Sequence, residues 1–232
     1  MLQIKSLGID LSSVRSGVAK LRLREDSWRI YLEQAQTLKA GRGVAEQAAR
    51  QFHVHQEVAR QIREIVEEYR PHIVGLEDYT NQPGSHVAFS MGQVGGLVRQ
   101  TLWECGVRVV LLHPSTVKSW TCIQIRNADD QLVPRTNKAM IKQYVLDYIL
   151  APGQELSGPD TKSIEDMCDA SVYALIAAFF FARLFFDKHP KLNSRQYEVL
   201  MRRTGDVEKF MIRNPDKEGE FYSKTWSPEV PS

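Results

Sequence analysis

The amino-acid sequence predicts an α/β fold in which a mixed five-stranded sheet carries helices on both faces. Residues 4–34 begin with a short strand pattern and continue with two segments in which apolar and polar residues alternate, as is typical of half-exposed strands joined by short turns. Two later segments, residues 73–78 and 107–114, are continuously apolar and are separated by a helical pattern. Such strands are typically parallel and buried on both sides. We therefore expect three antiparallel strands followed by parallel strands.

The first three strands are predicted over residues 4–9, 18–24 and 28–34. The first is an apolar run that leads directly into an acid, Asp10. In the second, every other side chain is apolar and its neighbours are basic, so one side of this strand should be buried and the other exposed. The chain therefore begins with an antiparallel meander.

Helical spacing of apolar residues predicts helices over residues 44–69, 85–104 and 137–149, and a buried helix that begins near residue 164. The second of these helices contains three glycines, of which Gly96 is the last. Glycine lowers helix propensity, so these glycines predict that a neighbouring backbone approaches this helix closely.

The domain organisation follows from the length and the change of composition near the carboxyl terminus. A chain of 232 residues suffices for one large domain with its own core. We predict a globular domain over residues 1–188 and an extension of mixed charge over 189–232, with one short helix around 195–203. Between the predicted helices, residues 118–137 are polar and are expected to form an irregular loop.

The composition indicates the cellular location of the protein better than its activity. Three cysteines without a CxxC pair favour a reducing, cytoplasmic location and no zinc knuckle. His53 and His55 stand two positions apart in a helical segment and do not face each other, so both are predicted to lie on the surface. The apolar run 172–186 is shorter than a spanning helix and is interrupted by Arg183, which predicts a buried helix and no membrane partner. The net charge of +2 excludes no class of ligand.

Four acids are the candidate functional residues, and we call them the acidic quartet: Asp10, Glu77, Asp166 and Asp169. The first two follow predicted strands, where sites of open α/β sheets gather, and the last two lie three residues apart on one helix face. Convergent carboxylates repel one another unless a cation binds between them, and oxygen ligands favour Mg²⁺ or Mn²⁺. Two such ions about 4 Å apart can position an attacking water and a leaving 3′ oxygen around a phosphodiester.

Each acid also has an ordinary structural interpretation. Asp10 suits an Asx turn in front of the following serines, and Glu77 could simply end a strand in solvent. Asp78 should point opposite to Glu77 and face the solvent. Ser163 and Asp166 have the spacing of a capping box at a helix start, which would explain one acid of the helix pair but not both.

Five motifs, in the order GIDLS, GLED, GQVGG, HPSTVKSW and DMCDA, resemble the RuvC family of Holliday junction resolvases, within the RNase H-like superfamily. The resemblance covers about residues 1–185 and implies an RNase H-like fold. It also implies that the acidic quartet binds Mg²⁺, two ions per active site, with Mn²⁺ as a substitute. Lys118 and Lys138 match basic positions that the family places near the scissile phosphate, where a lysine could neutralise developing charge.

The resemblance implies a Mg²⁺-dependent DNA endonuclease that resolves four-way junctions or other branched DNA by paired nicks, and hence a homodimer with two active sites. Candidate DNA contacts are the aromatic Tyr79, which could stack on an unpaired base or pack on the sheet edge, and basic side chains in the loop and the following helix. Lys138 and Lys142 equally suit the solvated face of an amphipathic helix. The basic candidates are Lys118, Arg126, Arg135, Lys138 and Lys142.

The sequence also departs from the family and leaves other functions open. The loop between Lys118 and Lys138 is longer than usual, Tyr79 comes one position early, and the extension 189–232 has no counterpart in the minimal domain. The segment GIDLSSVRSGVA also resembles the first phosphate loop of actin-like and sugar-kinase-like proteins, although the chain lacks room for their second domain. An RNase H-like nuclease acting on flaps, forks or RNA–DNA hybrids is a further alternative.

Overall fold

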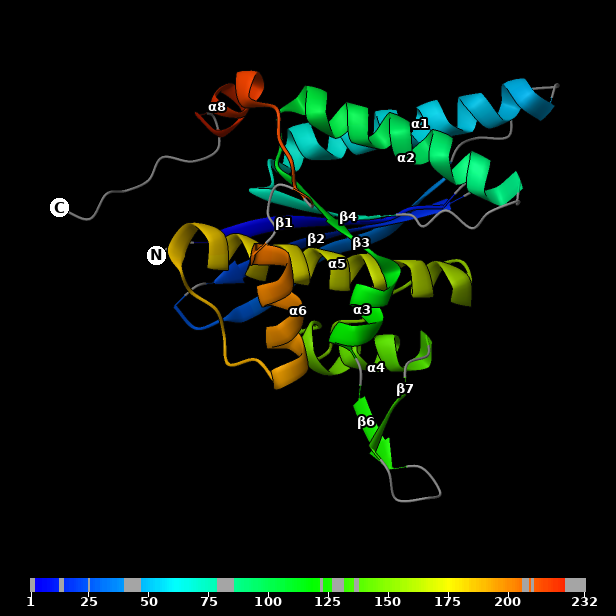
Figure 1. Cartoon of the computed structure of the whole chain (residues 1–232). Coiled ribbons are helices and arrows are strands. Elements are labelled where there is room, and N and C mark those ends of the chain that lie inside the picture. Colours follow the sequence, from blue (N-terminus) through cyan, green and yellow to red (C-terminus); the bar gives the residue numbers. More distant parts are fainter. Residues whose placement is uncertain are drawn as a thin grey trace.

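The computed structural model shows a six-stranded mixed sheet with helices on both faces (Figure 1). The strands lie in the order β3-β2-β1-β4-β5-β8. The structure describes residues 3–12, 15–24, 26–39, 47–78, 86–121, 123–126, 132–135, 138–205, 209 and 211–223. The strands of the sheet are β1 (Gln3–Asp10), β2 (Arg15–Arg24), β3 (Arg29–Lys39), β4 (Ile73–Glu77), β5 (Val109–Leu112) and β8 (Met211–Ile212).

The pairing confirms the predicted fold class. Strands β1, β2 and β3 form an antiparallel meander, and β4 and β5 then add in parallel to β1. The extension contributes one more strand than predicted, because the two-residue β8 pairs antiparallel with β5. The helices are α1 (Gln47–Tyr69), α2 (His86–Cys105), α3 (Pro114–Trp120), α4 (Lys138–Tyr148), α5 (Thr161–Phe186), α6 (Ser194–Gly205) and α8 (Pro215–Ser223).

Two apolar cores lie on the two faces of the sheet. Helices α1 and α2 cover one face, while α5 crosses the other with α3, α4 and α6 beyond it (Figure 1). Side chains along β1 alternate between the two cores. Leu7 and Ile9 pack with α1 and α2, whereas Ile4 packs on the α5 side. Helix α5 is long and apolar enough to span a membrane, yet here it is the buried core helix of that second layer.

Helix α5 touches the sheet backbone directly through glycines, which we call the glycine contact. Gly8 of β1, Gly17 of β2 and Gly75 of β4 face the helix, and Gly8 pairs with Gly75 across the two strands. A Cβ atom on Gly8 would lie 1.9 Å from the carbonyl oxygen of Ala170. Equivalent atoms on Gly17 and Gly75 would lie 2.2 and 2.3 Å from α5 carbonyl oxygens. No side chain fits between helix and sheet at these points.

Three expectations about local structure were wrong. The predicted irregular loop 118–137 contains the end of α3 and an antiparallel hairpin of β6 (Ile123–Arg126) and β7 (Leu132–Arg135). His55 is buried and hydrogen-bonds Ser90 Oγ at 3.3 Å, because it lies one turn from Val58 on the apolar stripe of α1. A Cβ on Gly96 would meet nothing within 4 Å, so this glycine serves no close approach.

The described part of the extension 189–232 packs back on the domain. The hydroxyl of Tyr222 donates to the carbonyl of His72 at 2.7 Å and accepts from the backbone N–H of Arg108 at 3.0 Å. Arg108 also pairs with Glu218 of α8, and both side chains are largely buried. These contacts fix α8 at the β4–β5 side of the sheet.

The glycine contact predicts a strong asymmetry between glycine substitutions. Gly8→Ala should lower the free energy of unfolding by about 3 kcal/mol or more, because the added methyl group overlaps a helix carbonyl and the helix must move. The matched control Gly96→Ala should stabilise the protein by up to about 1 kcal/mol, because alanine favours the α2 helix and meets open space. Urea denaturation of both variants measures the difference, and equal effects would refute the contact.

Candidate functional site

Asp10 and Glu77 lie side by side where two neighbouring parallel strands end. The register pairs Ile9 with Leu76, so the next residue of each strand emerges at the same edge of the sheet. Glu77 Oε2 accepts a hydrogen bond from the backbone N–H of Leu11 at 3.0 Å. This contact holds the Glu77 carboxylate against the chain that follows Asp10.

Burial and mutual repulsion both disfavour the charged forms of Asp10 and Glu77. Burial raises the pKa of Asp10 well above its ordinary value, and the negative charges of Glu77 and Asp169 raise it further. Burial also raises the pKa of Glu77, although its hydrogen bonds with Asp10 and Leu11 oppose that shift. Ionisation of both carboxyl groups at once is therefore unfavourable.

Helix α5 brings the other two members of the acidic quartet to the same edge. Gly17 is the register partner of Asp10, and the backbone of Asp166 lies directly over Gly17. One turn further along α5, burial raises the pKa of Asp169 to about 6. The charge of Lys138 opposes this rise, whereas the carboxylates Glu77 and Asp166 add to it. The four acids of the quartet thus lie close enough for their charges to interact.

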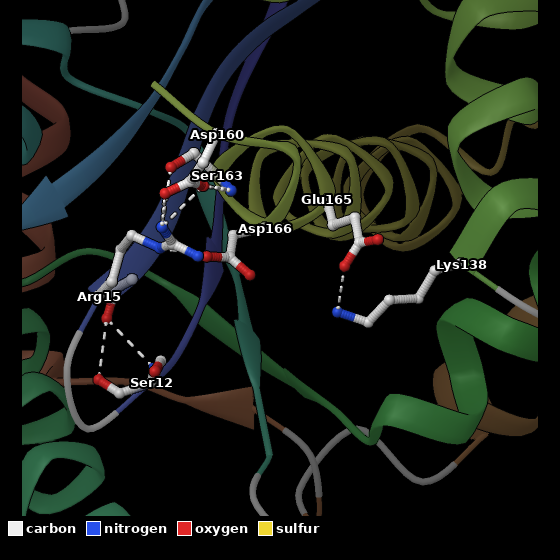
Figure 2. A network of polar contacts seen from close by, with 8 residues as sticks. Ser12, Arg15, Lys138, Asp160, Ser163, Glu165 and Asp166 are labelled. Carbon is white, nitrogen blue, oxygen red and sulfur yellow. Dashed lines mark hydrogen bonds and ion pairs between the residues drawn. The ribbon is translucent and has the colours of Figure 1, made fainter. Parts of the chain in front are cut away.

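Asp166 is held by Arg15, which the sequence interpretation did not select (Figure 2). Arg15 Nε donates to Asp166 Oδ2 at 2.8 Å, and its Nη1 donates to Asp160 at 3.0 Å and to Ser163 Oγ at 2.9 Å. Both members of the Arg15–Asp166 pair are nearly buried. A basic residue five positions after the strand-end acid was the available signal, but its partners lie about 150 residues away.

The capping-box interpretation of Asp166 is wrong. Asp160 is the N-cap of α5, and its Oδ1 accepts from the backbone N–H of Ser163 at 2.6 Å. Asp166 lies in the second turn, too far along the helix to cap it, and turns to Arg15 instead. The local structural explanation therefore accounts for neither acid of the pair. Asp78, which was expected to face the solvent, has a side chain that is 37% exposed and pairs with Arg99 at 2.7 Å.

Lys138 approaches the acids from the opposite side of α5 (Figure 2). It is the first residue of α4, and its Nζ lies 2.9 Å from Glu165 Oε2. Partial burial disfavours its charge, but Glu165 together with Asp169 and Asp166 raises the pKa of Lys138 overall. Lys142 lies one turn along α4 and is exposed. Lys118 is exposed in the last turn of α3, a helix that begins two residues after β5.

The remaining predicted DNA contacts are not placed beside the acids. Tyr79 lies outside the described residues. Arg126 and Arg135 belong to the β6–β7 hairpin, a separate two-stranded sheet that projects from the body of the protein (Figure 1). Arg135 pairs with Ile123 at the base of the hairpin and Arg126 with Leu132 towards its tip, and their side chains lie outside the described part.

The donor set fits a hard divalent cation in its chemistry. It consists of carboxylate oxygens alone, and a cation beside the half-buried Asp10–Glu77 pair would offset the repulsion that raises the pKa of Asp10. Within the described ranges, no three carboxylate, imidazole or thiol groups already surround one point closely enough to bind a metal. Asp166 in particular has one oxygen engaged by Arg15, so metal binding would require local rearrangement.

The strand order, with helices on both faces of the sheet, is that of an RNase H-like fold. Among solved structures, the chain is similar to RuvC of Thermus thermophilus, with a TM-score of 0.55, 18% identity, and coverage of 77% of this chain and 95% of RuvC. RuvC of T. thermophilus in complex with a Holliday junction substrate gives a TM-score of 0.54 at 17% identity, covering 74% of this chain and 90% of that one.

A yeast mitochondrial Holliday junction resolvase is also similar, with a TM-score of 0.50 and 11% identity, covering 89% of this chain and 84% of that chain. No protein-family model and no curated protein matches the sequence. At these identities the likeness establishes the fold, which is RuvC-like as the sequence motifs predicted.

The raised pKa values predict how stability depends on pH in metal-free buffer with EDTA. The raised carboxyl groups bind more protons in the folded than in the unfolded chain between pH 4 and 6, so their contribution to the free energy of unfolding should fall as pH rises through this window. Buried His72, whose pKa is lowered to about 4, contributes with the opposite sign, so the effect of Asp169 is read from a comparison of variants. Asp169, with a pKa of about 6 against an ordinary 3.8, contributes at most about 3 kcal/mol. In urea denaturation from pH 4 to 8, the free energy of unfolding of the wild type should fall relative to that of Asp169→Asn as pH rises. Asp147→Asn, at an exposed carboxylate of α4, should follow the wild type.

Arg15 should contribute more to stability than an exposed arginine. Arg15→Met leaves Asp166 without its cation and should lower the free energy of unfolding by about 3 kcal/mol, as breaking a buried pair does. Arg60→Met removes an exposed arginine that pairs with two glutamates of α1 and should cost under about 1 kcal/mol. Thermal and urea unfolding compare the two, and equal losses would show that the Arg15 network is not special.

Proposed function

We propose that this protein is a Mg²⁺-dependent DNA endonuclease that resolves four-way junctions. The observation that carries the proposal is the convergence of the acidic quartet at the carboxyl edge of a RuvC-like sheet, where burial and neighbouring carboxylates raise the pKa of Asp10, Glu77 and Asp169. One of the similar structures contains a Holliday junction, which supports branched DNA as the substrate.

In this proposal the acidic quartet would hold two Mg²⁺ ions, whose chemistry would be to activate a water and to stabilise the leaving 3′ oxygen of the phosphodiester. Mn²⁺ has the same preference for oxygen ligands and should substitute. The products would be a 5′ phosphate and a 3′ hydroxyl. Because resolution needs two symmetric nicks, two copies of the chain would act together as a homodimer.

The cationic side chains have separate roles in the same proposal. Lys138 lies next to Glu165 and within the field of Asp169, where its ammonium can approach the scissile phosphate and offset charge that develops there. Lys118 on α3 would contact the DNA backbone on the β5 side of the acids. Arg15 positions Asp166 by holding one of its two carboxylate oxygens, an arrangement typical of groups that orient metal ligands.

Cleavage of a defined panel of DNA substrates tests the proposal. Wild-type protein with Mg²⁺ should introduce paired nicks in a synthetic four-way junction in preference to a flap, a replication fork, an RNA–DNA hybrid and a linear duplex. Asp169→Asn should reduce the single-turnover cleavage rate by about 10²-fold or more, since it removes a charged oxygen ligand. Asp147→Asn serves as the matched control and should cleave at the wild-type rate.

The outcomes separate the alternatives left open by the sequence. Cleavage that survives Asp169→Asn would discredit the assigned site. Preferential cleavage of flaps, forks or hybrids would keep the chemistry and change the substrate. Binding of ATP without Mg²⁺-dependent cleavage would favour an actin-like or sugar-kinase-like protein.

A further inference from the structure

A polar cavity of about 90 Å³ lies between helices α3 and α6, outside the acidic quartet. Hydroxyl groups of α3 and guanidinium groups of α6 line it, and we call it the α3–α6 cradle. A cavity of this volume holds about three water molecules, so it suits a small anionic group better than an extended organic ligand. The residues of the cradle used below are Ser115, Ser119, Arg195, Glu198 and Arg202.

The arginines of the cradle are held in place by contacts within and between the two helices. Glu198 pairs with Arg195 and with Arg202, at 3.1 Å in each case. Arg195 also reaches across to α3, where its Nη2 lies 3.4 Å from Ser119 Oγ. The two arginine side chains are nevertheless 55% and 74% exposed, so their guanidinium groups remain accessible to a ligand.

The local charge selects the sign of that ligand. In the cradle two arginines, Arg195 and Arg202, face a single glutamate, Glu198. On α1 the balance is reversed, since Arg60 alone pairs with Glu57 and Glu64. Ion pairs on α1 therefore describe an ordinary solvated helix face, whereas the cradle combines excess positive charge with hydroxyl donors. Guanidinium and hydroxyl groups together are typical of contacts with phosphate oxygens.

The cradle is connected to the acidic quartet through α3. Glu77 and Leu112 are register partners at the ends of β4 and β5, and α3 begins two residues after Leu112. Helix α6 lies beside α3 on the same side of α5 (Figure 1). A nucleic-acid strand that passes the carboxyl edge of the sheet and follows α3 therefore reaches α6.

We propose that the α3–α6 cradle binds a phosphate of the DNA backbone away from the scissile phosphate, and that this contact is a role of helix α6 in the carboxyl-terminal extension. The proposal rests on the function proposed above, because it names a further contact with the same substrate. It assigns the cradle to affinity and not to the cleavage step, since its arginines belong to a surface separate from the four acids.

Salt-dependent binding measures the contact directly. Asp169→Asn protein is titrated onto a fluorescent four-way junction between about 50 and 300 mM salt, with and without the double substitution Arg195→Gln and Arg202→Gln. Loss of one phosphate contact should reduce the slope of log affinity against log salt by about 1 and weaken binding several-fold at low salt. Arg60→Gln, an exposed helical arginine of α1 with glutamate partners, is the matched control and should leave the slope unchanged.

Three further measurements keep the result interpretable. Thermal unfolding must show that the double variant is folded, and a second variant pair, Arg195→Lys and Arg202→Lys, should restore most of the slope because it keeps the charge. In the wild-type background, the double glutamine variant at saturating protein should cleave at a rate within about two-fold of normal.

The cradle proposal is overturned if the double variant binds with the parent slope, or if Arg60→Gln lowers the slope equally. Either result leaves the proposed nuclease function intact. If the parent protein itself fails to bind junction DNA, the proposed function and the cradle fall together.

Discussion

The close approach of helix α5 to the sheet is the constraint on which the candidate site depends. Gly8, Gly17 and Gly75 leave no side chain between the helix and three adjacent strands, so the helix backbone rests on the strand backbone. The acids of α5 are thereby lowered to the level at which β1 and β4 end. Any side chain at these glycines would lift the helix and separate its acids from the Asp10–Glu77 pair, even though every acid would still be present.

The same compact arrangement creates an electrostatic cost that the surroundings offset in part. Burial raises the pKa of Asp10, Glu77 and Asp169, which shows that the folded chain disfavours their simultaneous ionisation. Arg15 and Lys138 lie on opposite sides of α5 (Figure 2). Their positive charges pair with Asp166 and Glu165 and so reduce the repulsion between the acids in the first turns of this helix. The carboxylates of Asp10 and Glu77 still repel each other. Shifted pKa values of this kind are common where a protein binds a charged ligand.

Sequence patterns predicted the elements that follow a period and the acids that follow strands. The alternating residues of β2 and the apolar runs of β4 and β5 correctly predicted which strands pair antiparallel and which pair parallel. Asp10 and Glu77 were selected because each comes at the end of a predicted strand. Arg15 was missed because its partners are distant in the chain, and such pairing leaves no periodic signal. The two residues of β8 and the short strands of the β6–β7 hairpin are too brief to produce one either.

Strand β8 also affects how the folded chain meets other polypeptides. Its residues Met211 and Ile212 pair with Val110 and Val109, the first residues of β5. Without them, the backbone N–H and C=O groups at the start of β5 would be unpaired, and an apolar strand with such a free edge can pair with a strand of another molecule. Met211 and Ile212 thus cover the first half of β5 and shorten the stretch of this edge that is open to pairing with another chain.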